Sequence, residues 1–470
     1  MRKLMKPLLL SVGLFVCPAI AICQQPVPAT LSLADAIALA RQHNPAYRQT
    51  IHDRAPAAWG VRNAWSSLWL PSVTASGGVG YAGPGEQNFL TSSFSQSVST
   101  WSSNYSFLLD WTLNGQTLSE PGLRKAQLNA AQADVVGAET NLVTAVTQQY
   151  LTVLQARDNA EVARQQLDHD EQFLKLAQAR YEVGRASLID VRQAQVARGA
   201  AEVSLLRART AVQVEKLRLF QQIGVSAPVD LGTVQLTDTF SVQTPTWRLS
   251  DLLGMAEQQN PSLKALRERE RAAGWGVKAA SSSWGPSVSL SAGWSGFTQQ
   301  LSDINPTIGS ARASAAADSA TCVYANSAWF NGGPGQVPLD CSIYTFSPQP
   351  IPLWGNFRQP LLVSQAKAQQ QDLQESVRAR GLQVQTDVSQ AYLTLETAFQ
   401  TIAIQDTNRT AAREQLLLAT ERYRVGSGTF FELLDAQVAG LRAETDYINA
   451  VYDYHKALAA LEAAVGRPLR

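Results

Sequence analysis

Arg180-Tyr181-Glu182-Val183-Gly184-Arg185 is the stretch that decides the fold, and it returns as Arg422-Tyr423-Arg424-Val425-Gly426-Ser427. The second copy stands 242 positions after the first. In each copy a long segment with apolar residues at helical spacing runs into the Tyr, meets the Gly three residues later, and is followed by a second such segment. Glycine readily adopts the positive φ with which a helix ends and the chain reverses. The pattern predicts two helical hairpins with matching tips, which indicates a duplicated chain.

The composition narrows the classes of partner. The 470 residues are 45% hydrophobic and carry a net charge of +1, so nothing favours nucleic acid or another polyanion as a ligand. Only 16% of the residues are charged, against about 25% in typical domains. The chain is instead rich in Ala, Gln, Ser and Leu, a composition that suits long helices packed through small residues.

The N-terminus predicts export. Residues 1–23 combine three basic residues, an apolar run over Leu8–Val16 and an Ala-x-Ala site at 19–21. The run is far shorter than the roughly 20 residues of a spanning helix, which favours a cleaved signal peptide over a membrane anchor. Val16 and Ile22 precede the two nearby cysteines where a lipoprotein signal has a small residue, so lipidation is not favoured.

The duplication covers most of the chain. A short amphipathic helix over Leu33–Pro45, ended by Asn-Pro, recurs over Leu249–Pro261. The segment 122–181 keeps a seven-residue apolar spacing with one four-residue step, which predicts a coiled-coil helix about 90 Å long. The predicted domains are a signal peptide at 1–23, a first repeat at 24–224 (strands about 71–113, long helices about 120–224), an irregular equatorial linker at 225–247, and a second repeat at 248–470 (strands about 286–355, long helices about 358–466).

Between the helices the apolar period changes to two. Residues 71–81, 101–113 and 287–294 alternate apolar and small polar side chains, which predicts strands with one apolar face. A fourth strand near 342–354 is interrupted by three prolines. Ten of the 11 Trp lie in 59–111 and 275–354, which favours a membrane interface; a soluble β-sandwich core is the alternative.

Four strands cannot close a barrel, and lipid does not tolerate open sheet edges. Several chains must therefore pool their strands: two would give eight and three would give twelve, and the strand pattern does not choose between them. The stretches 82–96 and 302–339 are predicted to be loops. In an exported chain Cys322 and Cys341 are predicted to form a disulfide across the second loop, with two free thiols as the alternative.

The ordered motifs resemble those of the TolC-type outer-membrane efflux protein family. They are the signal peptide, the tandem repeat, Asp35-Ala-Ile-Ala-Leu-Ala40 with Asn44-Pro45, the Arg-Tyr-x-x-Gly tips, Ala194-Gln195 with Ala436-Gln437, and Trp111-Thr-Leu-Asn-Gly115. The resemblance implies an α+β homotrimer with a long periplasmic coiled-coil helical barrel. Its four β-strands per chain would complete a 12-stranded outer-membrane β-barrel.

The resemblance also implies a function and partners. The chain would be the passive exit duct of a tripartite efflux pump or type I secretion system, in the outer membrane of a Gram-negative bacterium with a large periplasmic part. A periplasmic adaptor (membrane fusion protein), an inner-membrane pump of the RND, ABC or MFS type and outer-membrane lipid would be its partners. The alternative is a periplasmic structural or adaptor coiled-coil protein without its own pore.

No catalytic, cofactor or metal site is predicted. The four His stand outside any zinc-helix spacing, and the chain has no phosphate loop, nucleophile elbow or Cys-x-x-Cys. An enzyme is therefore not expected.

The resemblance places gating at the tips. Tyr423 and Asp190 match the family's lock tyrosine and aspartate, while the lock arginine would fall at Gly428, so that Arg422 or Arg424 would have to substitute. Glu432 and Asp435 match the family's entrance acids, whose ring would attract cations. The alternatives are helix-dipole stabilisation for Asp190 and a solvated helix face for the two entrance acids.

The tips are also the expected adaptor-docking points. The tip residues are Val183, Gly184, Arg185, Val425, Gly426 and Ser427. The alternative is that Gly184 and Gly426 serve only to make the turns. Both roles can hold together.

Overall fold

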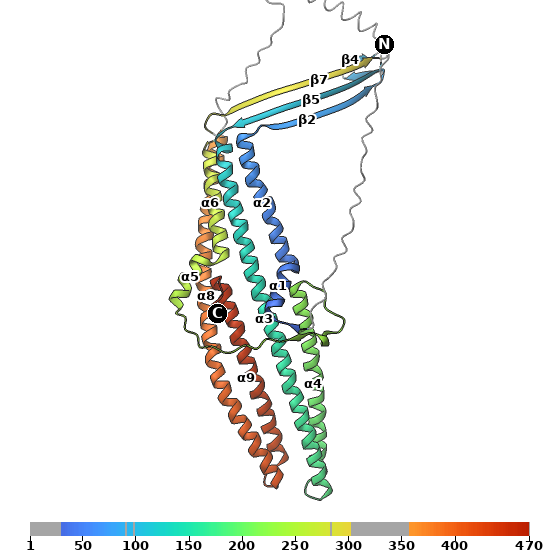
Figure 1. Cartoon of the computed structure of the whole chain (residues 1–470), viewed down its shortest axis with the longest axis vertical. Helices are drawn as coiled ribbons and strands as arrows, with labels where there is room; N and C mark the ends of the chain where they lie inside the picture. Colours follow the sequence, from blue (N-terminus) through green and yellow to red (C-terminus); the bar gives the residue numbers. More distant parts are fainter. Residues whose placement is uncertain (1–29, 90–91, 97–98, 283, 302–356, 470) are drawn as a thin grey trace, which may run out of the picture. The chain divides into compact units, whose positions relative to one another are not determined.

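A computed structural model describes residues 30–89, 92–96, 99–282, 284–301 and 357–469. The elements of the first repeat are β1 (Thr30–Leu31), α1 (Leu33–His43), α2 (Pro45–Trp69), β2 (Ser72–Ala82), β3 (Gly85–Phe89), β4 (Ser92–Gln96), β5 (Thr100–Leu113), α3 (Gly115–Glu182) and α4 (Leu188–Ile223). A 3-10 turn, η1 (Leu231–Thr233), and β6 (Gln235–Leu236) follow. The elements of the second repeat are α5 (Leu249–Gln259), α6 (Pro261–Ser282), β7 (Val288–Leu301), α8 (Arg358–Val425) and α9 (Phe430–Val465) (Figure 1).

The helices confirm the duplication. The long helices α3 and α8 each have 68 residues, and the return helices α4 and α9 each have 36. The tip glycines Gly184 and Gly426 have φ of +73° and +87°, in the left-handed region that glycine tolerates. The predicted hairpins and their turn chemistry are therefore correct.

The chain divides into two compact units. The first contains the described residues of 1–52, 134–262 and 381–470, and the second contains 53–133 and 263–380. In the first unit, hydrogen bonds join α4 to α3 (Gln149 to Glu215, 2.8 Å) and α3 to α9 (Tyr452 to Asp158, 2.6 Å). Arg413 joins α8 to α9 through Glu444 at 2.8 Å. These contacts give the lateral order α8, α9, α3, α4 along the middle of the helices, whereas at the tips α8 also contacts α3 directly.

The core of this unit follows the predicted seven-residue spacing. Leu142, Val146 and Val153 of α3 are buried together with residues of α1 and α4. Arg409, which interrupts the apolar pattern of α8, lies with its guanidinium 3.7 Å from the ring centroid of Tyr447 and pairs with Asp406 at 2.6 Å. The cation is thus partnered at a position where the equivalent residue of the first repeat is leucine.

The two Asn-Pro corners fasten the upper ends of the return helices. The Asn44 side chain donates to the carbonyl of Gln222 at 2.8 Å, and Asn260 does the same to Ala464 at 3.0 Å. Gly224 and Gly466 end the helices with φ of +86° and +88°. A Cβ added to Gly224 would lie 2.7 Å from the carbonyl oxygen of His43, which is too close for any other residue to fit without a shift of the backbone. This Asn–Gly contact, named here the corner clamp, occurs in both repeats and was not foreseen from the sequence.

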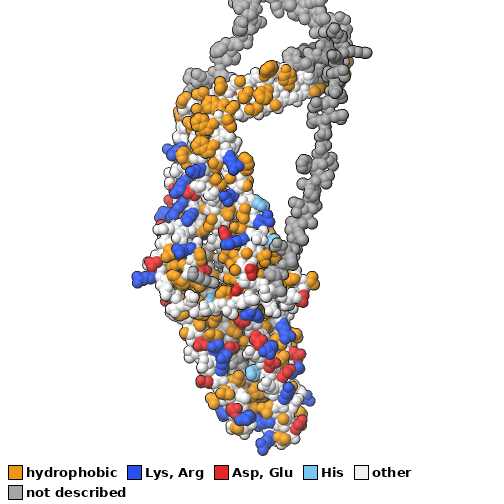
Figure 2. All heavy atoms as spheres, in the orientation of Figure 1, with side chains coloured by type: hydrophobic (Ala, Val, Ile, Leu, Met, Phe, Trp, Pro, Cys, Tyr) orange, Lys and Arg blue, Asp and Glu red, His pale blue; other side chains and the backbone are white. Residues whose placement is uncertain are grey.

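The second unit contains a three-stranded antiparallel sheet in the order β2-β5-β7. Its register aligns apolar residues with apolar ones, since Phe107 lies opposite Ala75 and Trp294. Small polar residues align on the other face, where the hydroxyls of Ser76 and Ser106 lie 2.7 Å apart. Figure 2 shows hydrophobic side chains gathered over the strands, with few charges among them. The apolar face is exposed, as the alternating sequence predicts.

Two predictions about the connections were wrong or incomplete. Residues 82–96 were predicted to be a loop, but β3 and β4 pair there as a short antiparallel hairpin. The linker 225–247 is not wholly irregular, since β6 pairs in parallel with β1 and thereby ties Leu31 to Leu236. The signal peptide, the fourth strand near 342–354 and the Cys322–Cys341 pair lie outside the described residues.

Candidate functional site at the helical tips

Each return helix begins with a capping box. Ser187 and Asp190 satisfy each other's main-chain amides at the start of α4: the Asp190 carboxylate accepts from the Ser187 N–H at 2.8 Å. Thr429 and Glu432 do the same at the start of α9, with distances of 3.2 and 3.3 Å. Carboxylates at this position cap exposed amides and complement the helix dipole. Two of the residues predicted for the gate thus have a local structural role at the tips.

Tyr423 lies in the core between the two tips. Its side chain is only 4% exposed and packs with Ala177, Val191 and Leu433, while its counterpart Tyr181 is 46% exposed. The Tyr423 ring meets Phe430 edge to face, with centroids 5.8 Å apart. The two tyrosines of the repeated motif therefore have different environments, and only the second joins the hairpins.

Arg180 of α3 clamps Tyr423. Its guanidinium donates to the main-chain carbonyl of Tyr423 and lies 4.6 Å from the centroid of the Tyr423 ring. The cation thus holds α8 by a charge-assisted hydrogen bond and by cation–π attraction. This contact, named here the Arg180 clamp, was missed from the sequence because Arg180 and Arg422 occupy equivalent positions in the repeat.

The Tyr423 hydroxyl is buried and has no hydrogen-bond partner among the described residues. Burial raises the pKa of the Tyr423 phenol, the positive charge of Arg180 partly offsets this, and the negative charge of Asp190 adds to it. The hydrogen bonds of Asp190 go to the cap, and its negative charge contributes only the smallest of these three effects on the pKa of Tyr423.

The two arginines predicted as substitutes for the lock have other partners. Arg424 pairs with Glu421 at 2.8 Å, and Arg422 lies 4.0 Å from Glu432. A Cβ on Gly428 would lie 3.1 Å from the Cβ of Arg422, so the site that the resemblance assigns to the lock arginine is crowded. Among the described cationic residues, Arg180 is the one whose guanidinium contacts the ring and the carbonyl of Tyr423.

The remaining predicted residues are at the surface. Glu432 and Asp435 are exposed on the first turns of α9. Val183 and Val425 project from the two tips, and no atom lies within 4 Å of a Cβ placed on Gly184. The tips thus present small, apolar and accessible surfaces.

Two features are absent from the described residues. No group of His, Cys, Asp or Glu there is arranged to hold a metal ion. In the same residues, no helix is both long enough and apolar enough to cross a membrane.

The duplicated helices, the apolar-faced sheet and the joined tips agree with the comparison with known families. The model for outer membrane efflux proteins matches residues 36–225 and 252–467. The chain belongs to the outer membrane efflux protein family. The match has two segments, one in each repeat.

Relatives are distant but extend over most of the chain. Outer membrane protein TolC of Vibrio cholerae is 26% identical over 449 residues, covering 93% of this chain and 90% of the relative. Outer membrane efflux protein BepC of Brucella suis is 24% identical over 352 residues, covering 75% and 69%. The solved structure of VceC from Vibrio cholerae aligns with a TM-score of 0.66 at 17% identity, covering 93% and 97%. The CmeC channel of Campylobacter jejuni aligns with a TM-score of 0.68 at 14% identity, covering 92% and 85%.

Membership of the outer membrane efflux protein family confirms the predicted family and α+β fold class. It places the chain in the outer membrane of a Gram-negative bacterium, with a part in the periplasm. It also identifies a transport protein rather than an enzyme, as predicted.

Proposed function

We propose that three copies of this chain form a passive exit duct of a tripartite efflux pump or type I secretion system. The apolar face of the β2-β5-β7 sheet carries the proposal. An exposed face bearing Trp101, Tyr105 and Trp294 suits lipid rather than water. The described strands of one chain leave sheet edges that lipid does not tolerate, and pooling strands between copies removes them.

Conductance tests this proposal. Detergent-purified protein should run as a trimer and should conduct ions when added to planar lipid bilayers. A preparation that stays monomeric and never inserts would contradict the duct.

The Arg180 clamp is the latch of the periplasmic entrance in this proposal. It joins the second hairpin to the first at the tips, where the duct is expected to narrow. Opening would move the α8–α9 tip away from α3, which breaks the hydrogen bond to the Tyr423 carbonyl and the contact with its ring. Tyr423 supplies the ring and the carbonyl of the latch, and Asp190 caps the start of α4.

Glu432 and Asp435 form the cation-binding ring of the same entrance. Three copies would bring six carboxylates around the axis, and such rings attract cations. Replacing both acids with Ala should weaken block of the conductance by trivalent cations. Glu182→Ala, which removes an exposed acid from the other tip, is the matched control and should keep the block. Unchanged block in the double variant would exclude the ring.

The tips dock a periplasmic adaptor in this proposal, and an inner-membrane pump supplies the energy. Val183-Gly184-Arg185 and Val425-Gly426-Ser427 are accessible and small enough to fit between the helices of a partner hairpin. Val183→Asp and Val425→Asp should reduce copurification of the adaptor encoded beside this gene, with unchanged conductance of the isolated duct. Full copurification with both variants would place docking elsewhere.

A further inference from the structure

The second compact unit is basic, whereas the first is acidic. Among the described residues of the second unit, Lys and Arg outnumber Asp and Glu, and in the first unit the acids outnumber the bases. The second unit is also the one that contains the β2-β5-β7 sheet with its exposed apolar face. Asp110 is the only charged residue of these three strands. The excess positive charge therefore lies on the helices next to the sheet.

Three exposed lysines, named here the basic band, lie at similar heights on α3, α6 and α8. They are Lys125 of α3, Lys278 of α6 and Lys367 of α8. Two close approaches fix the heights: a Cβ added to Gly122 of α3 would meet the Trp275 ring of α6. A Cβ added to Gly274 of α6 would lie 3.4 Å from Gln370 of α8. Each lysine is three residues from one of these contacts, so at 1.5 Å per residue the basic band is roughly 9 Å tall.

The basic band lies on the same face of the unit as the apolar side of the sheet. On α6, Lys278 continues a stripe of exposed cations at seven-residue spacing, with Arg271 and Lys264. This stripe lies between the side of α6 that meets α3, at Trp275, and the side that meets α8, at Gly274. Figure 2 looks onto the apolar face of the sheet and shows Lys and Arg side chains gathered on the helices below the strands.

An aromatic ring holds one cation of the basic band in place. The Lys278 ammonium lies 4.3 Å from the centroid of the Trp275 ring. The ring is itself fixed, because a Cβ on Gly122 would lie 2.5 Å from one of its carbons. A cation on an aromatic face keeps its other side open to an anion, and an amphipathic ring of this kind suits the border between lipid and water.

The acids at this height do not neutralise the basic band. Glu120 of α3 pairs with Arg124 at 2.7 Å. Asp372 of α8 is five residues from Lys367, which places it about 140° around the helix and so on another side. The face that carries the three lysines is therefore positively charged.

The basic band is at the height expected of lipid headgroups. Trp69 at the end of α2 and Trp284 just before β7 are 74% and 68% exposed, and exposed Trp marks the edge of the hydrocarbon. Lys278 is four residues from the end of α6, and Lys125 is ten residues from the start of α3. The basic band thus lies roughly 6 to 15 Å beyond the strands. A headgroup layer is about 5 to 8 Å thick, and its field reaches a further Debye length of about 8 Å.

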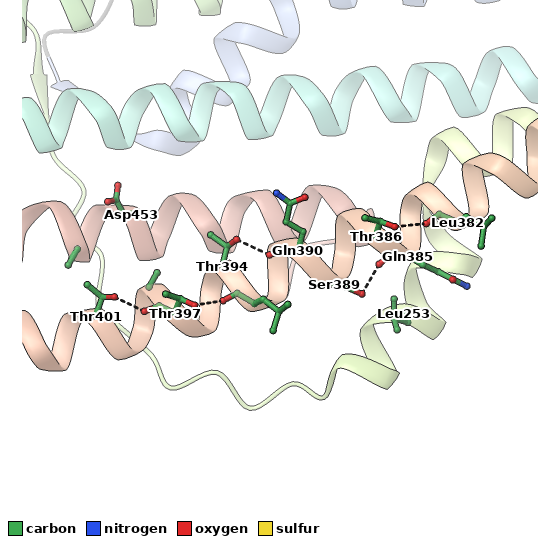
Figure 3. Close-up of a pocket in the computed structure, with 13 residues that line it drawn as sticks. Leu253, Leu382, Gln385, Thr386, Ser389, Gln390, Thr394, Thr397, Thr401 and Asp453 are labelled. Atoms are coloured by element: carbon green, nitrogen blue, oxygen red, sulfur yellow. Dashed lines mark hydrogen bonds between the residues drawn. The ribbon is translucent and has the colours of Figure 1, made fainter.

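A groove in the other unit does not offer an alternative site for an anion. It has a volume of about 900 Å³ and lies between α5, α8 and α9 (Figure 3). Its lining includes Asp453 and neither Lys nor Arg. The hydroxyls of its threonines donate to main-chain carbonyls of α8 at 2.8 to 3.1 Å, so they are not free to donate to a phosphate.

We infer that the basic band binds the phosphate groups of anionic phospholipid in the leaflet of the outer membrane that faces the periplasm. Two observations argue for this partner: the three lysines continue the apolar face of the sheet, and their charge is opposite to that of the headgroups. The inference rests on the proposed function, because it takes that apolar face to lie in lipid. It goes further by naming the lipid class and the residues that select it.

Lipid selectivity tests the inference. Full-length protein is reconstituted in phosphatidylcholine vesicles with a trace of spin-labelled phosphatidylglycerol or spin-labelled phosphatidylcholine. Electron paramagnetic resonance separates labelled lipid held at the protein from free lipid. The wild type should prefer phosphatidylglycerol about two- to fivefold, since one lysine beside an anionic surface contributes roughly fivefold. Lys125→Gln, Lys278→Gln and Lys367→Gln together, the band variant, should reduce this preference to about one.

A matched control removes the same charge elsewhere. Lys175→Gln, Arg192→Gln and Arg207→Gln together act on exposed positions of α3 and α4 in the first unit. This control variant should keep the wild-type preference. Raising the salt concentration from about 0.1 M to about 1 M shortens the Debye length from about 10 Å to about 3 Å, and should lower the wild-type preference toward one.

The other outcomes separate this inference from the duct. Equal preference in the wild type and the band variant would overturn the inference. Wild-type vesicles that conduct ions but hold both labelled lipids equally would overturn it and leave the duct intact. Binding to purified peptidoglycan that the band variant loses, without any lipid preference, would overturn it and assign the lysines to the cell wall. A protein that holds no labelled lipid and conducts nothing would contradict the duct and, with it, the inference.

Discussion

The Arg180 clamp can be removed without disturbing the core around it. Arg180→Gln keeps a polar side chain of similar reach but removes the charge. A hydrogen bond to a charged group contributes about 1.5 to 3 kcal/mol, and a partly exposed cation–π contact about 0.5 to 1 kcal/mol. Because Arg180 is half-buried, the lower values apply, which gives about 2 kcal/mol per chain. At 1.4 kcal/mol per factor of ten, the equilibrium between closed and open tips should shift roughly thirtyfold toward open.

Single-channel recording in planar bilayers measures this shift as an increased open probability at low voltage. Arg185→Gln, which removes an exposed arginine from the same tip, is the matched control and should behave like the wild type. Arg180→Lys should fall between the two, because it keeps the charge but not the planar fork that reaches both the carbonyl and the ring. The thermal midpoint should change little, because the apolar cluster around Tyr423 remains. An Arg180→Gln channel that gates like the wild type would refute the latch.

Three further outcomes are expected. A Tyr423→Phe channel should gate like the wild type. The Arg180 clamp uses the ring and the main-chain carbonyl of Tyr423, whereas the Tyr423 hydroxyl has no hydrogen-bond partner in the described part of the chain. A marked change in open probability would show that the hydroxyl takes part. Burial raises the pKa of Tyr150 to about 12. Between pH 10 and 12 the folded chain therefore keeps the phenol proton of Tyr150, whereas the unfolded chain loses it. The free energy of unfolding should fall by up to about 3 kcal/mol as the pH rises through this range. Circular dichroism of Tyr150→Phe should show a smaller loss over that range, and an unchanged loss would assign it to other groups. Gly224→Ala should lower the free energy of unfolding by about 2 kcal/mol or more, because the φ of Gly224 is +86° and an added Cβ would lie 2.7 Å from the carbonyl oxygen of His43. Gly381→Ala is the control, because the space around Gly381 is open, and it should be neutral or stabilising by up to about 1 kcal/mol. Equal effects of the two substitutions would contradict this reasoning.

The repeated helices and strands could be predicted because their signals are local. The seven-residue spacing of Leu142 and Val153 and the two-residue alternation around Phe107 follow directly from which face is buried or apolar. The tip glycines were predicted because a helix reversal needs positive φ. The β3–β4 hairpin was missed because its two strands are rich in Gly, Ser, Asn and Gln and contain no β-branched residue, the type that most readily identifies a strand.

The site was harder to predict because its contacts join distant segments. The Ser187–Asp190 and Thr429–Glu432 capping boxes have a readable spacing, and that signal was overlooked. The Arg180 clamp has no local signal: Arg180-Tyr181 and Arg422-Tyr423 are the same dipeptide, and which arginine meets which tyrosine depends on how the hairpins meet. The crowding at Gly428 likewise depends on the turn that brings it back to Arg422.

The corner clamps have a mechanical consequence for the hairpins that extend below them. Asn44 and Gly224 fix the upper end of α4, as Asn260 and Gly466 fix that of α9, and each helix then runs for 36 residues to its tip. At 1.5 Å per residue this is a lever arm of roughly 54 Å. A tilt of about 6° at the pivot moves the tip by roughly 5 to 6 Å, so a small change of angle at the corner clamp becomes a displacement of several ångströms at the far end of the hairpin.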